Sequence, residues 1–303
     1  MSQIAEIEQC GRTFTNQEIE EIAETVNAFP GLSQTTLTET ICEHLAWFTA
    51  TGRYKKDACL KLLIKIEAAG TIKLPPRRTR PKPRTSKAKP SFPQTLPTHQ
   101  PVHCKLKSAR PISVEPATSR NEVALWNQYV EQYHYLGYKR PFGCFIRYFA
   151  RSAKGEILAC ALFAGAAKSI SARDNWIGWN SAQRLRNLPW IVNNSRFVIM
   201  PWVNIAHLAS HVLGQVRRRI SGDWFAIWGY RPLLLESFVD PEKYKGTCYK
   251  ASNWRLIGQT TGEGLARKGK TYTTTPKLIF AMPLQKNFRK QLCQEYLVGR
   301  VDI

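Results

Sequence analysis

The stretch of residues 233–264 holds the side chains whose types and spacing are best suited to chemistry. It opens with three leucines, which predict a buried central strand. Glu236 and Asp240 are four residues apart, so they share a face if the strand extends that far. With Asp174 from an earlier loop, they predict an acidic cluster that binds Mg²⁺ or Mn²⁺ for phosphodiester chemistry. The alternative is a buried strand whose acids cap the next helix.

A second set of candidates lies in the segment GTCYK, where Cys248 or Tyr249 would act as a nucleophile. A reactive cysteine needs a lowered pKa, and Lys245 or Lys250 would supply the neighbouring positive charge. The alternative is a small buried cysteine beside a packing tyrosine.

Three histidines are weaker candidates. His207 and His211 have the spacing of neighbours on one helix face, but they lack the glutamate and third ligand of a metalloprotease helix. They therefore favour capping or core roles, and His134 is a candidate general base.

The net charge of +22 indicates a polyanionic partner. Residues 1–73 carry seven basic and ten acidic side chains, whereas residues 74–110 carry ten basic and no acidic ones. Nucleic acid is the expected partner, through phosphate neutralisation and counter-ion release. No apolar stretch is long enough to span a membrane, and no basic amphipathic helix indicates binding to its surface.

Basic side chains interleaved with tryptophans predict a groove for phosphates and stacked bases, a role that needs no catalysis. The tryptophans could instead be core residues of an α/β domain. The candidate nucleic-acid-binding residues are Arg173, Arg196, Arg217, Arg218, Arg219, Lys245 and Lys250, with Arg77 and Arg78 from the basic segment.

Three regions follow from composition and periodicity. Residues 1–74 predict a small helical, helix-turn-helix-like domain, with three helices and a short strand at residues 71–74. Residues 75–110 are rich in proline, arginine and lysine and predict an extended linker. Residues 111–303 predict the main domain. A three-helix interaction module is the alternative for the first region.

The main domain has the pattern of a mixed α/β fold. A helix over residues 121–135 precedes two strands, at 144–150 and 157–164, that are joined by a hairpin turn. The remaining expected elements are strands at 195–201, 233–240, 255–259 and 277–282 and helices starting at residues 181 and 206.

Several blocks in this order resemble the DruA family of the Druantia anti-phage systems, whose members also occur in mobile elements. The blocks are HYLGY (134–138), ARDNWIGW (172–179), NNSRFVIMPWVNIAHLASHVLG (193–214), LLLESFVDPEKYKGTCYKASNW (233–254) and IGQTTG (257–262). Residues 42–76 resemble the leader of longer members. The resemblance covers nearly the whole chain except the linker and implies DNA-related work in defence or transposition.

A weaker resemblance, of fold only, is to the GNAT acyltransferases, which share the order hairpin, strand, long helix, strand and tyrosine-bearing helix. That family binds the CoA pyrophosphate on a glycine-rich loop at a helix N-terminus. The corresponding turn here, residues 202–207, has no glycine, which argues against acetyl-CoA.

The sequence therefore predicts a cytoplasmic DNA-binding protein of phage defence or a mobile element, with metal-dependent nuclease or transposase-like chemistry as the leading mechanism. Its acidic N-terminus lacks the apolar core of a signal peptide. The alternatives are a non-catalytic DNA-recognition subunit that works with partner proteins, and a GNAT-like group-transfer enzyme.

Overall fold

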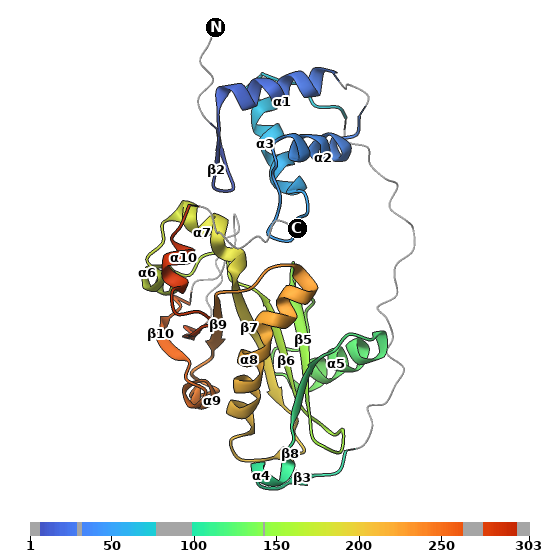
Figure 1. The fold of residues 1–303 in the computed structure, drawn as a ribbon, viewed down its shortest axis with the longest axis vertical. Helices are drawn as coiled ribbons and strands as arrows, with labels where there is room; N and C mark the ends of the chain where they lie inside the picture. Colours follow the sequence, from blue (N-terminus) through green and yellow to red (C-terminus); the bar gives the residue numbers. More distant parts are fainter. Residues whose placement is uncertain (1–6, 29–31, 77–98, 142, 263–274, 296–303) are drawn as a thin grey trace. The chain divides into compact units, whose positions relative to one another are not determined.

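A computed structural model describes residues 7–28, 32–76, 99–141, 143–262 and 275–295. The chain divides into two compact units (Figure 1). The first comprises residues 1–91 with 181–186, and the second comprises residues 92–180 with 187–303.

The first unit is helical, as the sequence predicted. A hairpin of β1 (Ile7–Gln9) and β2 (Arg12–Phe14) precedes helices α1 (Asn16–Ala28), α2 (Gln34–His44) and α3 (Lys56–Ala68). Their apolar faces bury one core, which includes Ile19, Leu37 and Leu62. The strand expected at residues 71–74 does not form, although Ile72 and Leu74 still bury their side chains in this core.

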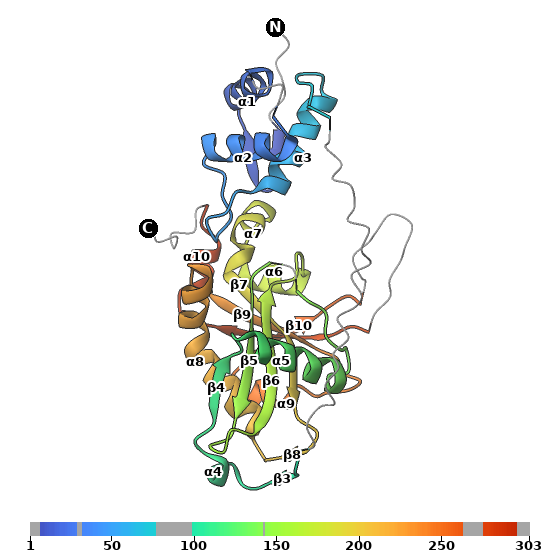
Figure 2. The same cartoon turned by 90° about the vertical axis from the view of Figure 1, so that its right-hand side faces the viewer.

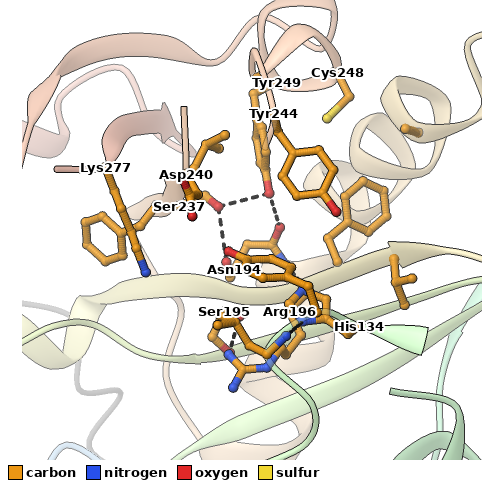
Figure 3. A pocket seen from close by; sticks show the side chains of 18 of the residues that line it. His134, Asn194, Ser195, Arg196, Ser237, Asp240, Tyr244, Cys248, Tyr249 and Lys277 are labelled. Atoms are coloured by element: carbon orange, nitrogen blue, oxygen red, sulfur yellow. Dashed lines mark hydrogen bonds between the residues drawn. The ribbon is translucent and has the colours of Figure 1, made fainter. Parts of the chain in front are cut away.

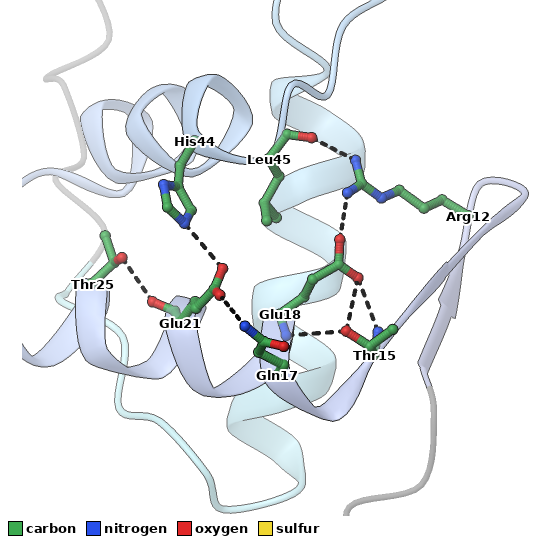
Figure 4. Close-up of polar contacts among 8 residues, drawn as sticks. All are labelled: Arg12, Thr15, Gln17, Glu18, Glu21, Thr25, His44 and Leu45. Atoms are coloured by element: carbon green, nitrogen blue, oxygen red, sulfur yellow. Dashed lines mark hydrogen bonds and ion pairs between the residues drawn. The ribbon is translucent and has the colours of Figure 1, made fainter.

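Arg12 ties the hairpin to two helices of this unit (Figure 4). Its Nη1 donates to the Leu45 carbonyl (2.8 Å), and its Nη2 pairs with Glu18 (2.5 Å). Glu18 also accepts a hydrogen bond from the Thr15 backbone N–H (2.9 Å), while the Thr15 hydroxyl accepts one from the Glu18 N–H (3.2 Å). This reciprocal capping box fixes the start of α1 at Thr15.

The helix-turn-helix prediction is not confirmed. Such a motif joins its two helices by a turn of about three to four residues, but residues 45–55 connect α2 to α3 and contain a bridge between Phe48 and Tyr54. Two lysines of α3 are engaged within the unit, because Lys56 pairs with Glu39 and Lys65 donates to the Glu8 carbonyl (2.9 Å).

The second unit is built on a seven-stranded sheet of order β10-β11-β9-β7-β6-β5-β4. All neighbouring strands are antiparallel except β7 and β9, which are parallel. This mixed sheet with flanking helices confirms the predicted α/β class. The strands are β4 (Ser113–Pro116), β5 (Phe145–Arg151), β6 (Ile157–Gly165), β7 (Ile191–Ile199), β9 (Leu234–Val239), β10 (Arg255–Gln259) and β11 (Leu278–Pro283).

Helices α5 (Arg120–Tyr133) and α8 (Leu208–Trp228) cover opposite faces of this sheet (Figures 1 and 2). Neighbouring residues of β5 show why, since side chains alternate along a strand. Tyr148 donates to Asp223 of α8 (2.8 Å), whereas the Phe149 ring contacts Tyr129 of α5. The shorter helices are α6 (Ser171–Ile177), α7 (Ser181–Asn187), η1 (Leu188–Trp190), α9 (Thr247–Ala251) and α10 (Phe288–Leu292).

The last part of the predicted linker is folded, so that prediction is wrong from residue 99 onward. Residues 102–103 form β3 (Val102–His103), which pairs with β8 (Val203–Asn204), and α4 (Leu106–Ala109) follows. The His99 ring stacks on Trp202 (3.8 Å between centroids), and its Nε2 hydrogen-bonds the Tyr129 hydroxyl (2.7 Å). These contacts hold a polar segment that has no apolar periodicity of its own.

No helix among the described residues has the length and apolar character needed to cross a bilayer. All eight cysteines are free thiols, which agrees with the absence of paired cysteine motifs in the sequence.

Candidate functional site

The parallel strands β7 and β9 stay together for only a few residues and then part. They pair from Ile191 with Leu234 to Asn193 with Glu236, after which β7 runs on to Ile199 and β9 to Val239. A cavity of about 620 Å³ opens between them. This volume lies within the range of about 300–1,000 Å³ that is usual for ligand sites.

A β-bulge lies where the strands part. Asn194 pairs with Phe163 of β6 and Arg196 pairs with Leu162, so Ser195 is an extra residue in β7. A bulge bends its strand and increases its twist. The Asn194 side chain secures it, since Nδ2 donates to the carbonyls of Leu162 (3.1 Å) and Arg196 (3.0 Å).

Asn194 also belongs to a buried polar network in the cavity wall (Figure 3). The Tyr249 hydroxyl donates to Asn194 Oδ1 (2.8 Å), and Ser237 Oγ lies 2.9 Å from that hydroxyl and 3.1 Å from the Asn194 carbonyl. Burial raises the pKa of Tyr249, so its phenol stays protonated at neutral pH. Tyr249 therefore acts here as a hydrogen-bond donor.

Gly246 lets the segment after β9 approach the sheet closely. Its φ is +66°, and a Cβ at this position would lie 2.5 Å from the Phe280 ring. The Tyr249 ring then stacks on the same Phe280 (5.3 Å between centroids). Only glycine allows both the positive φ and the close approach to the Phe280 ring. Gly246 therefore positions Tyr249.

Cys248 also lines the cavity, but its environment is the opposite of what a nucleophile needs. Burial raises the pKa of its thiol, whereas reactive cysteines have a lowered pKa. The geometry favours a thiol that packs in the wall.

Charged groups of both signs line the cavity. Arg196, Lys245 and Lys277 contribute positive charge, and Asp240 contributes a carboxylate. Arg196 is held by the backbone, since its Nε donates to the Gly137 carbonyl (2.8 Å) and its Nη1 to the Ser195 carbonyl (2.7 Å). Figure 3 shows Tyr244 beside Tyr249, with Asn194 below them and Arg196 next to His134.

His134 lies in the same cavity wall, and its imidazole is uncharged. Burial, and then the nearby Arg196, lower its pKa to about 4. Its Nδ1 accepts a hydrogen bond from the Leu136 N–H (3.2 Å), a role that requires an unprotonated nitrogen. A pKa this low makes the imidazole a weak base near neutral pH, and its role as a general base stays a prediction.

Two buried polar atoms of β7 have no hydrogen-bond partner among the described residues. They are Asn193 Oδ1 and Ser195 Oγ, and both residues line the cavity. A buried polar atom without a partner costs about 1–3 kcal/mol. Both atoms are fully buried behind the cavity surface.

Glu236 and Asp174 lie in a separate, closed cluster around Arg173, which is 0% exposed. Arg173 Nη1 pairs with Glu236 (3.0 Å), and its Nη2 lies 2.8 Å from Asp174 Oδ1. Burial raises the pKa of Glu236, and the guanidinium opposes this. The Ala167 N–H also donates to Glu236 (3.0 Å), so the cluster joins the segment after β6 to β9.

The structure does not gather the predicted metal ligands. Asp240 lines the cavity, whereas Glu236 and Asp174 bind Arg173. Within the described residues, no three His, Cys, Asp or Glu side chains form a group that could hold a metal ion, and this includes His207 and His211. The sequence pattern showed the carboxylates but not the arginine that lies between two of them.

The predicted nucleic-acid-binding residues have different environments. Arg173 is fully buried, so its prediction as a phosphate contact is wrong, and Arg219 pairs with Asp223 (2.6 Å). Arg217, Arg218 and Lys250 are exposed, Lys245 is exposed at the cavity, and Arg196 is half-buried in its wall. Arg77 and Arg78 lie outside the described residues.

Sequence reasoning missed the polar residues of the bulge and their partner Ser237. A signal was present, because the run Asn193, Asn194 and Ser195 interrupts an otherwise apolar strand and asparagine is depleted in strands. It also missed Tyr135 and Tyr244, which line the cavity.

The fold and the cavity define an α/β protein with a ligand-sized site between two diverging strands. A family model described as Druantia protein DruA matches residues 70–273. The chain therefore belongs to this family, and the resemblance to the Druantia anti-phage systems is confirmed. A search of curated proteins found no match.

The solved structures that a comparison of folds found include acetyltransferases. Spermidine N-acetyltransferase from Vibrio cholerae has 9% identity and a TM-score of 0.37, covering 57% of this chain and 95% of that chain. A phosphinothricin N-acetyltransferase homologue has 14% identity and a TM-score of 0.36, covering 58% and 99%. At these values, the likeness carries no inference about ligand or reaction.

Proposed function

We propose that this chain is a DNA-binding component of a Druantia anti-phage system, that it works in the cytoplasm, and that it holds its target at the cavity between β7 and β9. The observation that carries this proposal is the cavity wall, where Arg196, Lys245 and Lys277 stand near aromatic rings. Cations bind phosphates, and aromatic faces bind bases. The net charge of +22 supports a polyanionic partner.

A recognition role fits this site better than metal-dependent cleavage does. The guanidinium of Arg173 already binds the carboxylates of Glu236 and Asp174, which Mg²⁺ or Mn²⁺ would need as ligands. Metal-dependent phosphodiester chemistry is the second candidate, favoured by the carboxylate of Asp240 in the cavity wall. In the leading proposal, other proteins of the defence system or mobile element act on the bound DNA.

Acyl transfer from acetyl-CoA has the least support. The turn of residues 202–207 before α8 has no glycine, and its Val203–Asn204 segment pairs with β3. A pyrophosphate cradle needs free backbone N–H groups at a helix start, and this turn is partly covered by another strand.

The test is DNA binding by the intact chain, with a charge change inside the cavity and a matched change elsewhere. The cavity variant is Lys245→Gln with Lys277→Gln, and the control is Lys154→Gln with Lys286→Gln, two exposed lysines that do not line the cavity. Fluorescence anisotropy with labelled single-stranded, duplex and branched DNA gives affinity over a series of salt concentrations.

We expect the cavity variant to bind about tenfold more weakly and to lower the salt dependence by about two counter-ions, whereas the control changes both less. Equal binding by the two variants would overturn the cavity as the binding site. The same samples with Mn²⁺ test the second candidate, because strand breaks that disappear in Asp240→Asn would establish metal-dependent chemistry.

A further inference from the structure

Two solvent-exposed aromatic side chains lie side by side at the cavity. Tyr135 and Tyr244 are 40% and 54% exposed, Leu136 beside them is also exposed, and all three line the cavity. The two tyrosine rings lie 5.8 Å apart between centroids, at 54° to each other. They come from distant parts of the chain, one after α5 and one after β9. Clustered exposed aromatic rings mark interaction sites.

The surroundings of this pair of tyrosines are cationic. Lys243 Nζ lies 5.5 Å from the centroid of the Tyr135 ring, and Lys245 and Lys277 line the same cavity. An aromatic pair beside ammonium groups suits a flat, electron-rich ring joined to a phosphate. Those are the two parts of a nucleotide.

The inner wall offers hydrogen bonds that the chain itself does not use. Asn193 Oδ1 and Ser195 Oγ have no partner among the described residues. An acceptor and a hydroxyl can bind the polar edge of a base, which carries both donors and acceptors. Both atoms are fully buried in this structure, so a base would reach them after a small movement of the wall.

The cavity volume of about 620 Å³ lies in the range of sites for single small ligands, which suits one nucleotide. A free mononucleotide would need few cations, yet the chain carries a net charge of +22. This charge favours a nucleotide that belongs to a longer strand.

We propose that the cavity receives a single unpaired nucleotide of a nucleic-acid strand. Its base stacks on one of the two rings of Tyr135 and Tyr244 and contacts the edge of the other, with its polar edge toward the wall at Asn193 and Ser195, while Lys245 and Lys277 hold the adjoining phosphates. The inference rests on the proposed function and names the unit of the target that the site binds. Taking a base out of its stack costs least in single strands and at unpaired positions.

The test compares two alanine variants of the intact chain. Tyr135→Ala with Tyr244→Ala removes the stacking pair, and Phe225→Ala removes an exposed aromatic ring on α8 that does not line the cavity. The probes are oligonucleotides with 2-aminopurine at one position, which is unpaired in one set and paired in the other. DNA and RNA versions of each, AMP and polyphosphate complete the series.

We expect the wild type and Phe225→Ala to prefer the unpaired site and to change the 2-aminopurine emission on binding. The tyrosine variant should lose that emission change and about tenfold or more in affinity for the unpaired site, while its binding of polyphosphate stays the same. The DNA and RNA arms identify which strand supplies the base.

Strand binding that is equal in the wild type and the tyrosine variant would overturn the inference and leave the proposed DNA-binding function in place. AMP binding as tight as that of the oligonucleotides would also overturn it, because a small molecule would then be the ligand. Failure to bind any nucleic acid would overturn the proposed function itself.

Discussion

The α/β unit holds two groups of buried polar side chains that each include a residue of β9, and they differ in what their atoms bind. In the cluster of Arg173, Asp174 and Glu236, the cation lies between two carboxylates. In the cavity wall, Asn194, Ser237 and Tyr249 bind one another, but the nearby atoms Asn193 Oδ1 and Ser195 Oγ have no partner among the described residues.

The difference distinguishes a group of side chains that stabilises the fold from a group that borders a cavity. Charges that bind one another within the protein leave no ligand position, and they hold the segment after β6 against β9. The polar network of the cavity wall instead borders a ligand-sized space. The two carboxylates that the sequence shows four residues apart are divided between these groups, since Glu236 pairs with Arg173 and Asp240 lines the cavity.

The largest effect on stability is expected in the closed cluster. Arg173→Met removes the cation between Glu236 and Asp174, and Glu236 is 0% exposed, so its charge would be left in the interior without a counter-ion. We expect the free energy of unfolding to fall by about 3–5 kcal/mol. Chemical denaturation followed by tryptophan fluorescence measures this change.

Arg217→Met, at an exposed position of α8, is the matched control and should change the free energy of unfolding by about 0.5 kcal/mol or less. If Arg173→Met were as stable as the control, the cluster would not be a structural element. Glu236 and Asp174 would then return as candidates for metal binding.

A smaller loss of stability is expected at Asn194, whose side chain supports the bulge in β7. Asn194→Ala removes the donor to the carbonyls of Leu162 and Arg196 and the acceptor for the Tyr249 hydroxyl. We expect about 2 kcal/mol of destabilisation, because buried groups are left unpaired.

The neighbouring residue gives a matched control within the same wall. Asn193→Ala removes a side chain whose Oδ1 has no partner among the described residues, so it should change the free energy of unfolding by about 0.5 kcal/mol or less. If both variants lost the same free energy of unfolding, the polar atoms of the cavity wall would all be bound within the protein, as those of the Arg173 cluster are.

Regular periodicity made much of the fold predictable. Hydrophobic patterns over short windows predict most of the regular elements. These are the hairpin β5–β6, the strands β9 and β11, and the helices α1, α2, α3, α5 and α8. Strand β3 could not be read in this way, since its two residues are ordered by pairing with β8. Its partner is about one hundred residues away in sequence.

The site was less predictable because it depends on distant pairing. The cavity exists because β7 leaves β9 after Asn193 and bends at the bulge of Ser195, and neither event is encoded in spacing. Similarly, the sequence places Arg173 beside Asp174 but gives no sign that Glu236 binds the same guanidinium. Tyr249 was named from the sequence, but its hydrogen-bond partners were not.

Lowering the pH should weaken the cavity wall through His134. Its pKa in the folded chain is about 4, below the ordinary value of 6.5, so between these values the unfolded chain binds a proton that the folded chain does not. Stability therefore falls as the pH decreases from 6.5 to 4. Because the imidazole is partly exposed, we expect a loss of about 1 kcal/mol.

The measurement is the free energy of unfolding at pH 7 and pH 4.5 for the wild type and for His134→Gln, a polar side chain that does not titrate. The difference between the two proteins isolates His134 from other groups that titrate in this range. Parallel pH profiles would contradict the assignment of a neutral imidazole.

The smallest effect on stability is expected at Tyr244. Its side chain is 54% exposed, so Tyr244→Ala should change the free energy of unfolding by about 0.5 kcal/mol or less. Loss of its stacking contact should nevertheless weaken single-strand binding by about tenfold. Arg173→Met is expected to show the reverse, a large loss of stability with normal affinity in the fraction that remains folded. If each variant lost both stability and binding, the Arg173 cluster and the cavity would be parts of one site. The binding position would then depend on the Arg173 ion pairs as much as the folded structure does.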